Sequence, residues 1–333
     1  MDDAPASDEQ LRLQKDNNIN NNNNNNNKKK KSSNNRQAKD NMSKLSPSLK
    51  ALINAPFARP GQAAAPSHIG QVYQSIARDA ASKKVGTKPW LAISAAATFT
   101  LNSPESLESL YSVASSSSSS SSPPGRPDKR ETAEFIREVG LKCISFNGIP
   151  RTINCLNAFY DALPADVTAQ LETRPTRAPT ARNLADVTAR GQALWDSIYA
   201  PFEVKLRDKL ARSHPDLPVH ILHSHYAALL SDPAAGERGG LASVGRVLTS
   251  VVAISCLRAQ TGVGPQVLSH VFGLRKGLED GFFEADARED VEGARWLASD
   301  EGSEWILRSV DAITEAIAGA SRSNFAPARE SKL

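Results

Sequence analysis

The chain has 333 residues, of which 40% are hydrophobic, and it carries a formal net charge of +4. Its three cysteines are widely spaced and odd in number, which argues against a disulfide framework of the kind found in small secreted proteins. The most apolar stretches, Trp90–Leu101 and Val244–Leu257, fall short of the roughly 18 residues that a membrane span needs. We therefore expect a soluble protein without a membrane span, with one substantial core or two small ones.

Residues 1–46 are predicted to form a disordered tail, because they contain almost nothing apolar to bury. Within them an Asn run, Asn20–Asn27, is followed directly by four lysines, Lys28–Lys31. Such lysines can serve nuclear import or bind nucleic acid, but no interleaved aromatic side chains are present to stack on bases. We expect no nucleic-acid partner.

Residues 47–164 are predicted to form a first set of helices. Apolar residues at helical spacing begin at Ile69, and Trp90–Leu101 is apolar almost all round, as in a buried helix. Ser103, Pro104 and Glu105 carry the signals of a helix start, with Ser103 as the cap. A Ser- and Pro-rich segment at about 112–130 is predicted to be a disordered insert between two helices.

The first set continues after this insert with two further helices. Asn147-Gly148 marks the turn between them, and Pro164 ends the second. Their apolar faces are expected at Ile136, Val139, Cys143 and Ile144, and then at Ile153, Leu156, Phe159, Tyr160 and Leu163.

A Pro- and Arg-rich linker at 165–183 leads to a second set of helices at 184–318. Their expected ranges are Leu184–Ile198, Phe202–Leu210, Leu217–Leu230, Leu241–Leu257, Val263–Leu278 and Trp305–Ile317. Strand-like alternation of apolar and polar residues is nowhere sustained, so the predicted fold class is all-α.

One helix-turn-helix design is predicted to occur twice, first at Arg137–Phe159 and again at Arg246–Leu274. Pairing Pro150 with Pro265 places Ile153 opposite Leu268 and keeps the apolar stripe in register. The alternative is chance, since any two amphipathic helices that follow a Gly/Pro turn can be aligned in this way.

The residues Ser269-His270-Val271-Phe272-Gly273-Leu274, together with Gly140–Arg151 (GLKCISFNGIPR), resemble the AhpD-like, carboxymuconolactone decarboxylase superfamily, particularly its two-repeat fungal members. The resemblance covers about residues 66–318 without the Ser-rich insert. It implies an all-α bundle that commonly forms homo-oligomers. The activities it implies are thiol-dependent peroxide reduction and decarboxylation of lactone acids.

Redox-active members of this family carry Cys-x-x-Cys-x-x-x-His, and this chain departs from that pattern. Counting back from His270 places Gln266 and Val263 where the two thiols should lie. His270 alone matches, and Cys155 stands at the equivalent place in the first repeat. Glu138 resembles an acidic residue that some members use to handle protons.

The candidate catalytic residues are the following six: His270, Glu138, Arg151, Cys143, Cys155 and Cys256. A peroxide-reducing cysteine must be a thiolate, and Lys142 and Arg137 are close in sequence to Cys143, as Arg258 is to Cys256. Each cysteine also falls in an apolar stripe, where a buried and inert thiol is the alternative. His270 is a candidate general base, or else it lines the contact between the repeats.

No metal or cofactor is expected. His220 and His223 share a helix face, but His225 points elsewhere and two ligands do not make a zinc site. The glycines at Gly262 and Gly264 follow no strand, so they do not form a phosphate-binding loop.

The last three residues, Ser331, Lys332 and Leu333, spell the address for import into peroxisomes. We therefore expect the flexible tail at 319–333 to bind the peroxisomal import receptor and to deliver the protein to the matrix. Two functions are compatible with these features: an enzyme acting on a hydroperoxide or a small carboxylic substrate, and a non-catalytic protein that binds a metabolite or another protein. The position of His270 relative to Glu138 and Arg151 separates them.

Overall fold

The computed structural model describes residues 45–53, 55, 62–116, 128–234, 236–237, 243–281 and 291–319. Every regular element in these ranges is a helix and no strand occurs among them, which confirms the all-α fold class. The described part of the chain contains no helix whose length and apolar content would let it cross a membrane. The predicted N-terminal tail up to residue 44 and the C-terminal tripeptide lie outside the described residues.

The chain divides into two units, Met1–Gly61 and Gln62–Leu333. The first unit contains helix α2 (Pro47–Ile53), which buries none of its residues. The predicted first helical set, 47–164, therefore includes residues of both units. Its first part, with α2, belongs to Met1–Gly61, and the rest belongs to Gln62–Leu333.

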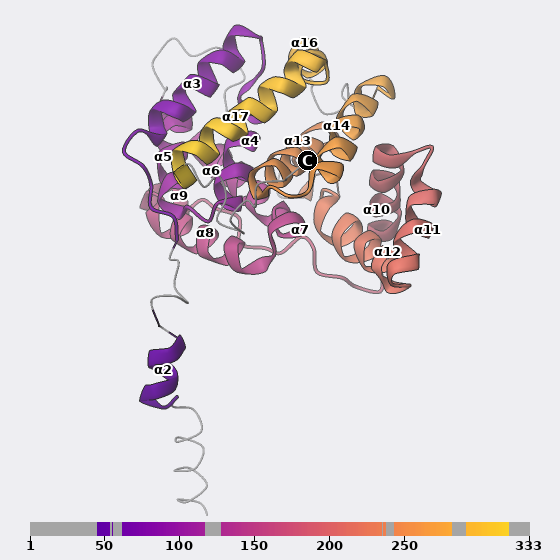
Figure 1. The fold of residues 1–333 in the computed structure, drawn as a ribbon, viewed down its shortest axis with the longest axis horizontal. Helices are drawn as coiled ribbons and strands as arrows, with labels where there is room; N and C mark the ends of the chain where they lie inside the picture. Colours follow the sequence, from indigo (N-terminus) through magenta and orange to yellow (C-terminus); the bar gives the residue numbers. More distant parts are fainter. Residues whose placement is uncertain are drawn as a thin grey trace, which may run out of the picture. The chain divides into compact units, whose positions relative to one another are not determined.

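The second unit holds the remaining helices (Figure 1). In chain order they are α3 (Ile69–Ser82), α4 (Thr87–Thr100), α5 (Pro104–Ser115), α6 (Lys129–Lys142), α7 (Ile144–Asn147), α8 (Ile149–Ala162), α9 (Ala165–Thr168), α10 (Leu184–Tyr199), α11 (Glu203–Ser213), α12 (Asp216–His220), the π-helix η2 (Ile221–Leu230), α13 (Arg246–Gln260), α14 (Gly264–Glu279), α16 (Val291–Leu297) and α17 (Asp300–Ala318).

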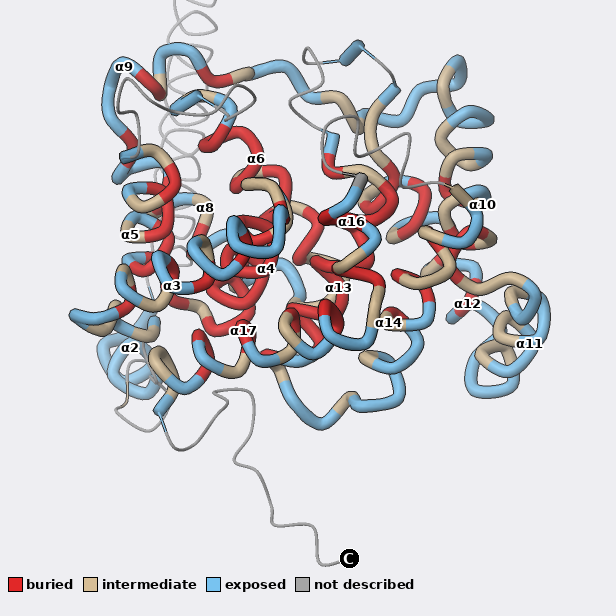
Figure 2. Tube along the Cα trace, turned by 90° about the horizontal axis from the view of Figure 1, so that it is seen from above, coloured by how far each residue is buried: buried red, intermediate tan, exposed pale blue. Residues whose placement is uncertain are grey.

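Helices α4 and α13 form the centre of the second unit and pack against each other. From Trp90 to Thr100 every residue of α4 is buried, as its all-round apolar sequence predicts. Figure 2 shows both helices buried along most of their length. Side chains from α3, α5, α6, α8 and α17 complete the main hydrophobic core around this pair.

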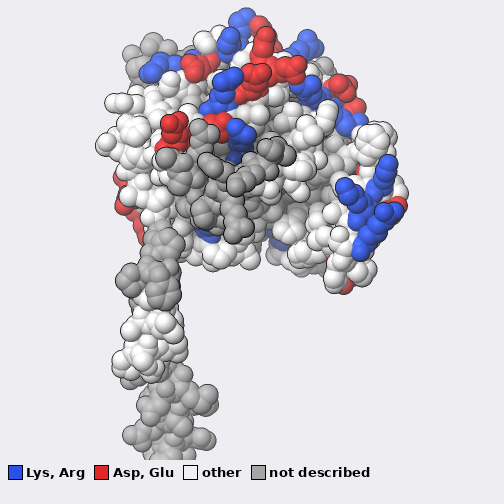
Figure 3. All heavy atoms as spheres, in the orientation of Figure 1, with Lys and Arg blue, Asp and Glu red and all other residues white. Residues whose placement is uncertain are grey.

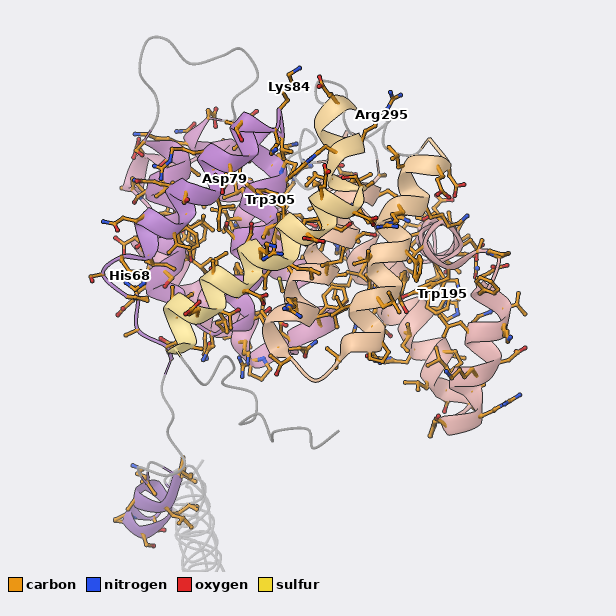
Figure 4. All side chains as sticks on the ribbon, turned by 45° about the horizontal axis from the view of Figure 1, so that its top comes forward. His68, Asp79, Lys84, Trp195, Arg295 and Trp305 are labelled. Carbon is orange, nitrogen blue, oxygen red and sulfur yellow. The ribbon has the colours of Figure 1, made fainter. Side chains whose placement is uncertain are left out.

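A smaller hydrophobic cluster joins α10 to the π-helix η2. It contains Trp195, Ile198, Leu222, Tyr226 and Leu230. Figure 4 labels Trp195 on α10 and, on α17, the half-buried Trp305 that packs against the main core. Helices α10 and η2 approach closely because Gly191 of α10 lies against the backbone of Ala227 of η2, where a Cβ would not fit.

Helix α11 lies at the periphery and buries none of its residues. Its sequence, EVKLRDKLARS, is rich in Lys and Arg, and Figure 3 shows basic side chains gathered where this helix lies. Elsewhere acidic and basic side chains form ion pairs, as Lys84 does with Glu292, whose Oε2 atom lies 3.0 Å from the Nζ of Lys84.

Several predicted boundaries shift. Ser103 precedes α5, but its hydroxyl donates to the carbonyl of Ala63 and does not cap the helix. The predicted insert at 112–130 is narrower, because α5 continues to Ser115 and α6 begins with a capping box between Asp128 and Glu131. Residues 117–127 lie outside the described part. The linker at 165–183 includes the short helix α9.

The sequence shows a closer internal match than the predicted one between 137–159 and 246–274. It aligns α4–α5 with α13–α14: Ala92-Ile93-Ser94 opposite Ala253-Ile254-Ser255, and Pro104 opposite Pro265. The connections agree, since each long helix passes through a three-residue turn into the next, whereas α6 and α8 are separated by α7. The predicted repeat stays unconfirmed, and the pairing of α4–α5 with α13–α14 has the better support.

Candidate functional site

The structure brings two of the three predicted thiols together. Cys143 ends α6 and Cys256 lies on α13, and their Sγ atoms are 3.5 Å apart although the residues are separated by 113 positions. We call Cys143 and Cys256 the thiol pair. Both side chains are free thiols and fully buried. No cysteine spacing along one helix predicts this contact, because it depends on how α6 crosses α13.

Helix α7 connects the thiol pair to its surroundings. The side-chain amide of Asn147 donates to Cys256 Sγ at 3.7 Å, and Asn147 Oδ1 lies 3.1 Å from Thr100 Oγ1. The carbonyl of Thr100 in turn accepts from the guanidinium of Arg151. A single turn of helix thus carries Cys143 at one end and, through Asn147, a donor to Cys256 at the other.

The cations near Cys143 in sequence do not activate it. Lys142 is buried and its ammonium bonds to the carbonyl of Leu230 and lies 2.8 Å from Asp232 Oδ1. Arg137 pairs with Glu134. Burial is the main cause that holds the pKa of Cys143 well above its usual value, and the hydrogen bond with Cys256 adds to it.

Cys155 lies on α8, in the same hydrophobic core as the thiol pair, and its charge acts on Cys143. It is fully buried, and this burial raises its pKa to about 12, although the charge of Arg151 acts in the opposite direction. A thiol with so high a pKa holds almost no thiolate at neutral pH.

His270 occupies an aromatic environment. Its ring lies edge-on to Phe146 and Tyr199, with centroids 6.0 and 6.1 Å away. Burial lowers its pKa to about 4, and the charge of Arg246 contributes in the same direction, so the imidazole is neutral at pH 7. Its Nδ1 atom is buried and has no hydrogen-bond partner among the described residues.

The guanidinium of Arg246 fixes the segment that bears His270. Its Nη2 donates to the carbonyls of Ser197 and Gly273 at 2.9 and 2.7 Å, and its Nε donates to Ser197 Oγ at 2.7 Å. These bonds tie the start of α13 to α10 and α14. They explain why the histidine side of α14 is packed inward.

Glu138 belongs to a separate buried network of charges along one face of α6. Its carboxylate makes a two-pronged ion pair with Arg177 and lies 4.0 Å from the ammonium of Lys142. Asp232 accepts from the backbone N–H groups of Val244 and Gly245, at 3.1 and 2.7 Å. The network therefore anchors the linker and the loop before α13 to α6.

The six predicted site residues thus do not form one catalytic centre. Cys143 and Cys256 are in contact, and His270 contacts Phe146 of α7, the helix that follows Cys143. Glu138 is held by Arg177 and Lys142, and Arg151 bonds to Thr100. Cys155 lies on α8 with Arg151, whose charge acts on it. His270 contacts neither Glu138 nor Arg151 in any bond or ring contact of the described structure.

The π-helix η2 places His225 next to His220. Because a π-turn returns after about five residues, His225 faces His220, with ring centroids 5.1 Å apart, and its Nδ1 lies 3.0 Å from Ser145 Oγ. The prediction that His225 points away from His223 did not anticipate this contact. Among the described residues no cluster of three or more His, Cys, Asp or Glu side chains could hold a metal ion.

Comparison with family models, with curated proteins and with solved structures found no match for this chain. The AhpD-like resemblance therefore rests on the residues quoted above.

Proposed function

We propose that this chain is an AhpD-like, non-catalytic protein of the peroxisomal matrix that acts by protein association, in the first place with a second copy of itself. The support comes from two equivalent apolar faces. Leu107 and Tyr111 on α5 are 0% and 6% exposed, whereas Leu268 and Phe272, at the matching positions of α14, are 56% and 61% exposed.

The difference follows from the neighbours of each helix. Helix α5 packs against α3, α4, α6 and α8. The main partners of α14 are α13 and α10, and it also meets α7 through His270 and Phe146 and α17 through Arg275 and Asp300. Large apolar side chains that are core residues in one copy of a pattern are left on the surface in the other. Exposed apolar side chains that group together mark contact surfaces, and α8 adds Ile149 and Ile153 to those available for association.

The packing of the chemical groups also favours association over catalysis. All three thiols are fully buried, and burial raises the pKa of Cys143 and of Cys155. The neutral His270 is enclosed by aromatic rings, and Glu138 is paired on both sides. A peroxide-reducing site needs an accessible thiolate.

The test is the molar mass of the full chain in solution, measured by light scattering after size-exclusion chromatography. We expect a dimer or larger oligomer for the wild type and a shift to monomer for Leu268→Ser/Phe272→Ser. Val204→Ser, which changes an exposed apolar residue on α11, serves as the matched control. A wild type that is monomeric at micromolar concentration would contradict the proposal.

The location is tested separately. A fluorescent protein fused before Met1 leaves Ser331, Lys332 and Leu333 at the free end, and we expect punctate peroxisomal fluorescence. Removal of Leu333 should make the signal diffuse. Diffuse fluorescence of the complete fusion would contradict the matrix location without bearing on association.

Thiol-dependent peroxide reduction is the second candidate function, and the contact between Cys143 and Cys256 favours it. Hydroperoxide consumption in the presence of a dithiol reductant tests it, with Cys143→Ser, Cys155→Ser and Cys256→Ser compared with the wild type. Turnover that is lost in Cys143→Ser or Cys256→Ser but kept in Cys155→Ser would support thiol-dependent peroxide reduction. No turnover by the wild type would remove it.

A further inference from the structure

The thiol pair has the arrangement of a latent disulfide. Its two Sγ atoms are in direct contact at 3.5 Å and come from helices far apart in the chain. A disulfide needs a sulfur separation of about 2.05 Å, so the sulfurs must approach by about 1.5 Å. Cys143 stands where α6 ends and the four-residue α7 begins, a place where the backbone changes from one helix to another.

We propose that Cys143 and Cys256 are a modification site at which an organic hydroperoxide or hydrogen peroxide forms an intramolecular disulfide. This does not rest on the proposed association, since a chain without this chemistry could still oligomerise. It also requires no turnover, because one oxidation per chain is sufficient.

The reaction proceeds in two steps. In the first, the Cys256 thiolate attacks the terminal oxygen of the hydroperoxide, the O–O bond breaks, and the alcohol leaves after taking the thiol proton. In the second, the sulfur of Cys143 displaces hydroxide from the Cys256 sulfenic acid, and the Cys143 proton leaves with it as water. The two sulfurs lose two electrons in total and the peroxide gains them.

The structure assigns the first step to Cys256. Its sulfur accepts the side-chain N–H of Asn147, a bond that stabilises negative charge on sulfur. The sulfur of Cys143 accepts no N–H in the described structure; it accepts the S–H of Cys256, and its neighbouring cations are engaged elsewhere. Cys143 is then the resolving thiol, already within van der Waals distance.

Burial determines how fast the disulfide forms. Both side chains are fully buried, so a reagent reaches them only when the structure opens locally. Helix α7 is the natural opening element, because it has four residues and none of them is buried. Oxidation should therefore be slow compared with that of an exposed thiol, and the enclosed site should favour the internal disulfide over mixed disulfides.

Peptide mapping of the reduced full chain tests the inference. The chain is incubated with cumene hydroperoxide or hydrogen peroxide, denatured, alkylated and digested without reductant. We expect a linked pair of peptides bearing Cys143 and Cys256, while Cys155 is alkylated. Complete alkylation of Cys143 and Cys256 after prolonged exposure, or a disulfide that includes Cys155, would overturn the proposal.

Two variants test the order of the steps. In Cys143→Ser, whose fold is checked by circular dichroism, a sulfenic-acid probe such as dimedone should label Cys256. In Cys256→Ser, Cys143 should stay reduced at least tenfold longer than Cys256 does in the first variant. Labelling of Cys143 at an equal rate would reject the assignment of Cys256, and if either variant fails to fold, the mapping of the wild type decides the inference alone.

Discussion

Helix pair α4–α5 and helix pair α13–α14 follow one sequence pattern in two different surroundings. Positions that face the central contact of α4 with α13 are alike, as at Ile93 and Ile254, both buried. Positions on the outer helices differ in exposure, since α3 and α8 cover α5, whereas the main partners of α14 are α13 and α10. The comparison shows that burial of an apolar residue is decided by the helices around it and not by its place in the pattern.

The chemical residues distinguish the two pairs further. Cys256 stands where α4 has Ala95, and His270 stands where α5 has Ser109. Both lie on the side of α13–α14 that meets the segment Cys143–Asn147, which provides Cys143, Phe146 and Asn147. The second pair thus carries the thiol and the imidazole at positions that are chemically inert in the first.

The largest effect is expected from matched truncations at equivalent positions. Leu107→Ala removes a fully buried side chain and should lower the free energy of unfolding by about 2–5 kcal/mol. Leu268→Ala should cost within about 0.5 kcal/mol in the monomer, because its side chain is already exposed. Urea unfolding at low protein concentration measures both, and equal losses there would break the comparison.

The free energy of unfolding should depend on pH through His270, which stands where α5 has Ser109. The pKa of about 4 in the folded chain lies below the value of about 6.5 for an unfolded histidine, so between these values only the unfolded chain binds the proton. Stability should therefore fall as the pH drops from about 6.5 to 4, by up to about 3 kcal/mol from this residue.

Urea unfolding of His270→Gln between pH 7 and pH 4.5 checks this prediction. The variant should lose stability less steeply than the wild type as the pH falls. An unchanged slope in His270→Gln would show that the imidazole is protonated without cost in the folded chain.

Cys256→Ala gives α13 the residue that α4 has at this position. The change removes one buried sulfur and should cost about 1 kcal/mol, in the range of small buried truncations. The same variant should leave Cys143 reduced after peroxide treatment. Unfolding in urea and alkylation mass spectrometry report the two outcomes, and a Cys143 that oxidises as fast as in the wild type would contradict the second.

The smallest effect is expected at Arg258, which stands opposite Ala97. Its guanidinium pairs with Asp311, with Nη2 2.6 Å from Oδ2, and both side chains are partly exposed. Arg258→Ala should cost about 0.2–1 kcal/mol, and less in 1 M salt, because exposed ion pairs are screened. Urea unfolding at low and high salt measures this, and a larger cost would assign the pair to the core.

Local patterns in the sequence predicted most of the helices. The all-round apolar run at Trp90–Leu101, the turn at Asn147-Gly148 and the helix end at Pro164 all occur in the structure. Helix α16 was missed. The helix predicted at Leu217–Leu230 occurs as α12 followed by η2, but its π-helical part was not predicted, because hydrogen bonds between residues five apart leave no apolar period in the sequence.

The sequence by itself determined the all-α class and the buried helix at Trp90–Thr100, but two positions of the predicted apolar faces, Ile153 and Tyr160, are exposed. Tertiary structure alone decided that Cys143 meets Cys256, that Lys142 is buried beside Asp232, and that Phe272 lies outside while Tyr111 lies inside. The physical reason is that helical periodicity is a local property of the backbone. Contact, burial and pKa depend on which helices cross, and residues far apart in the chain decide that together.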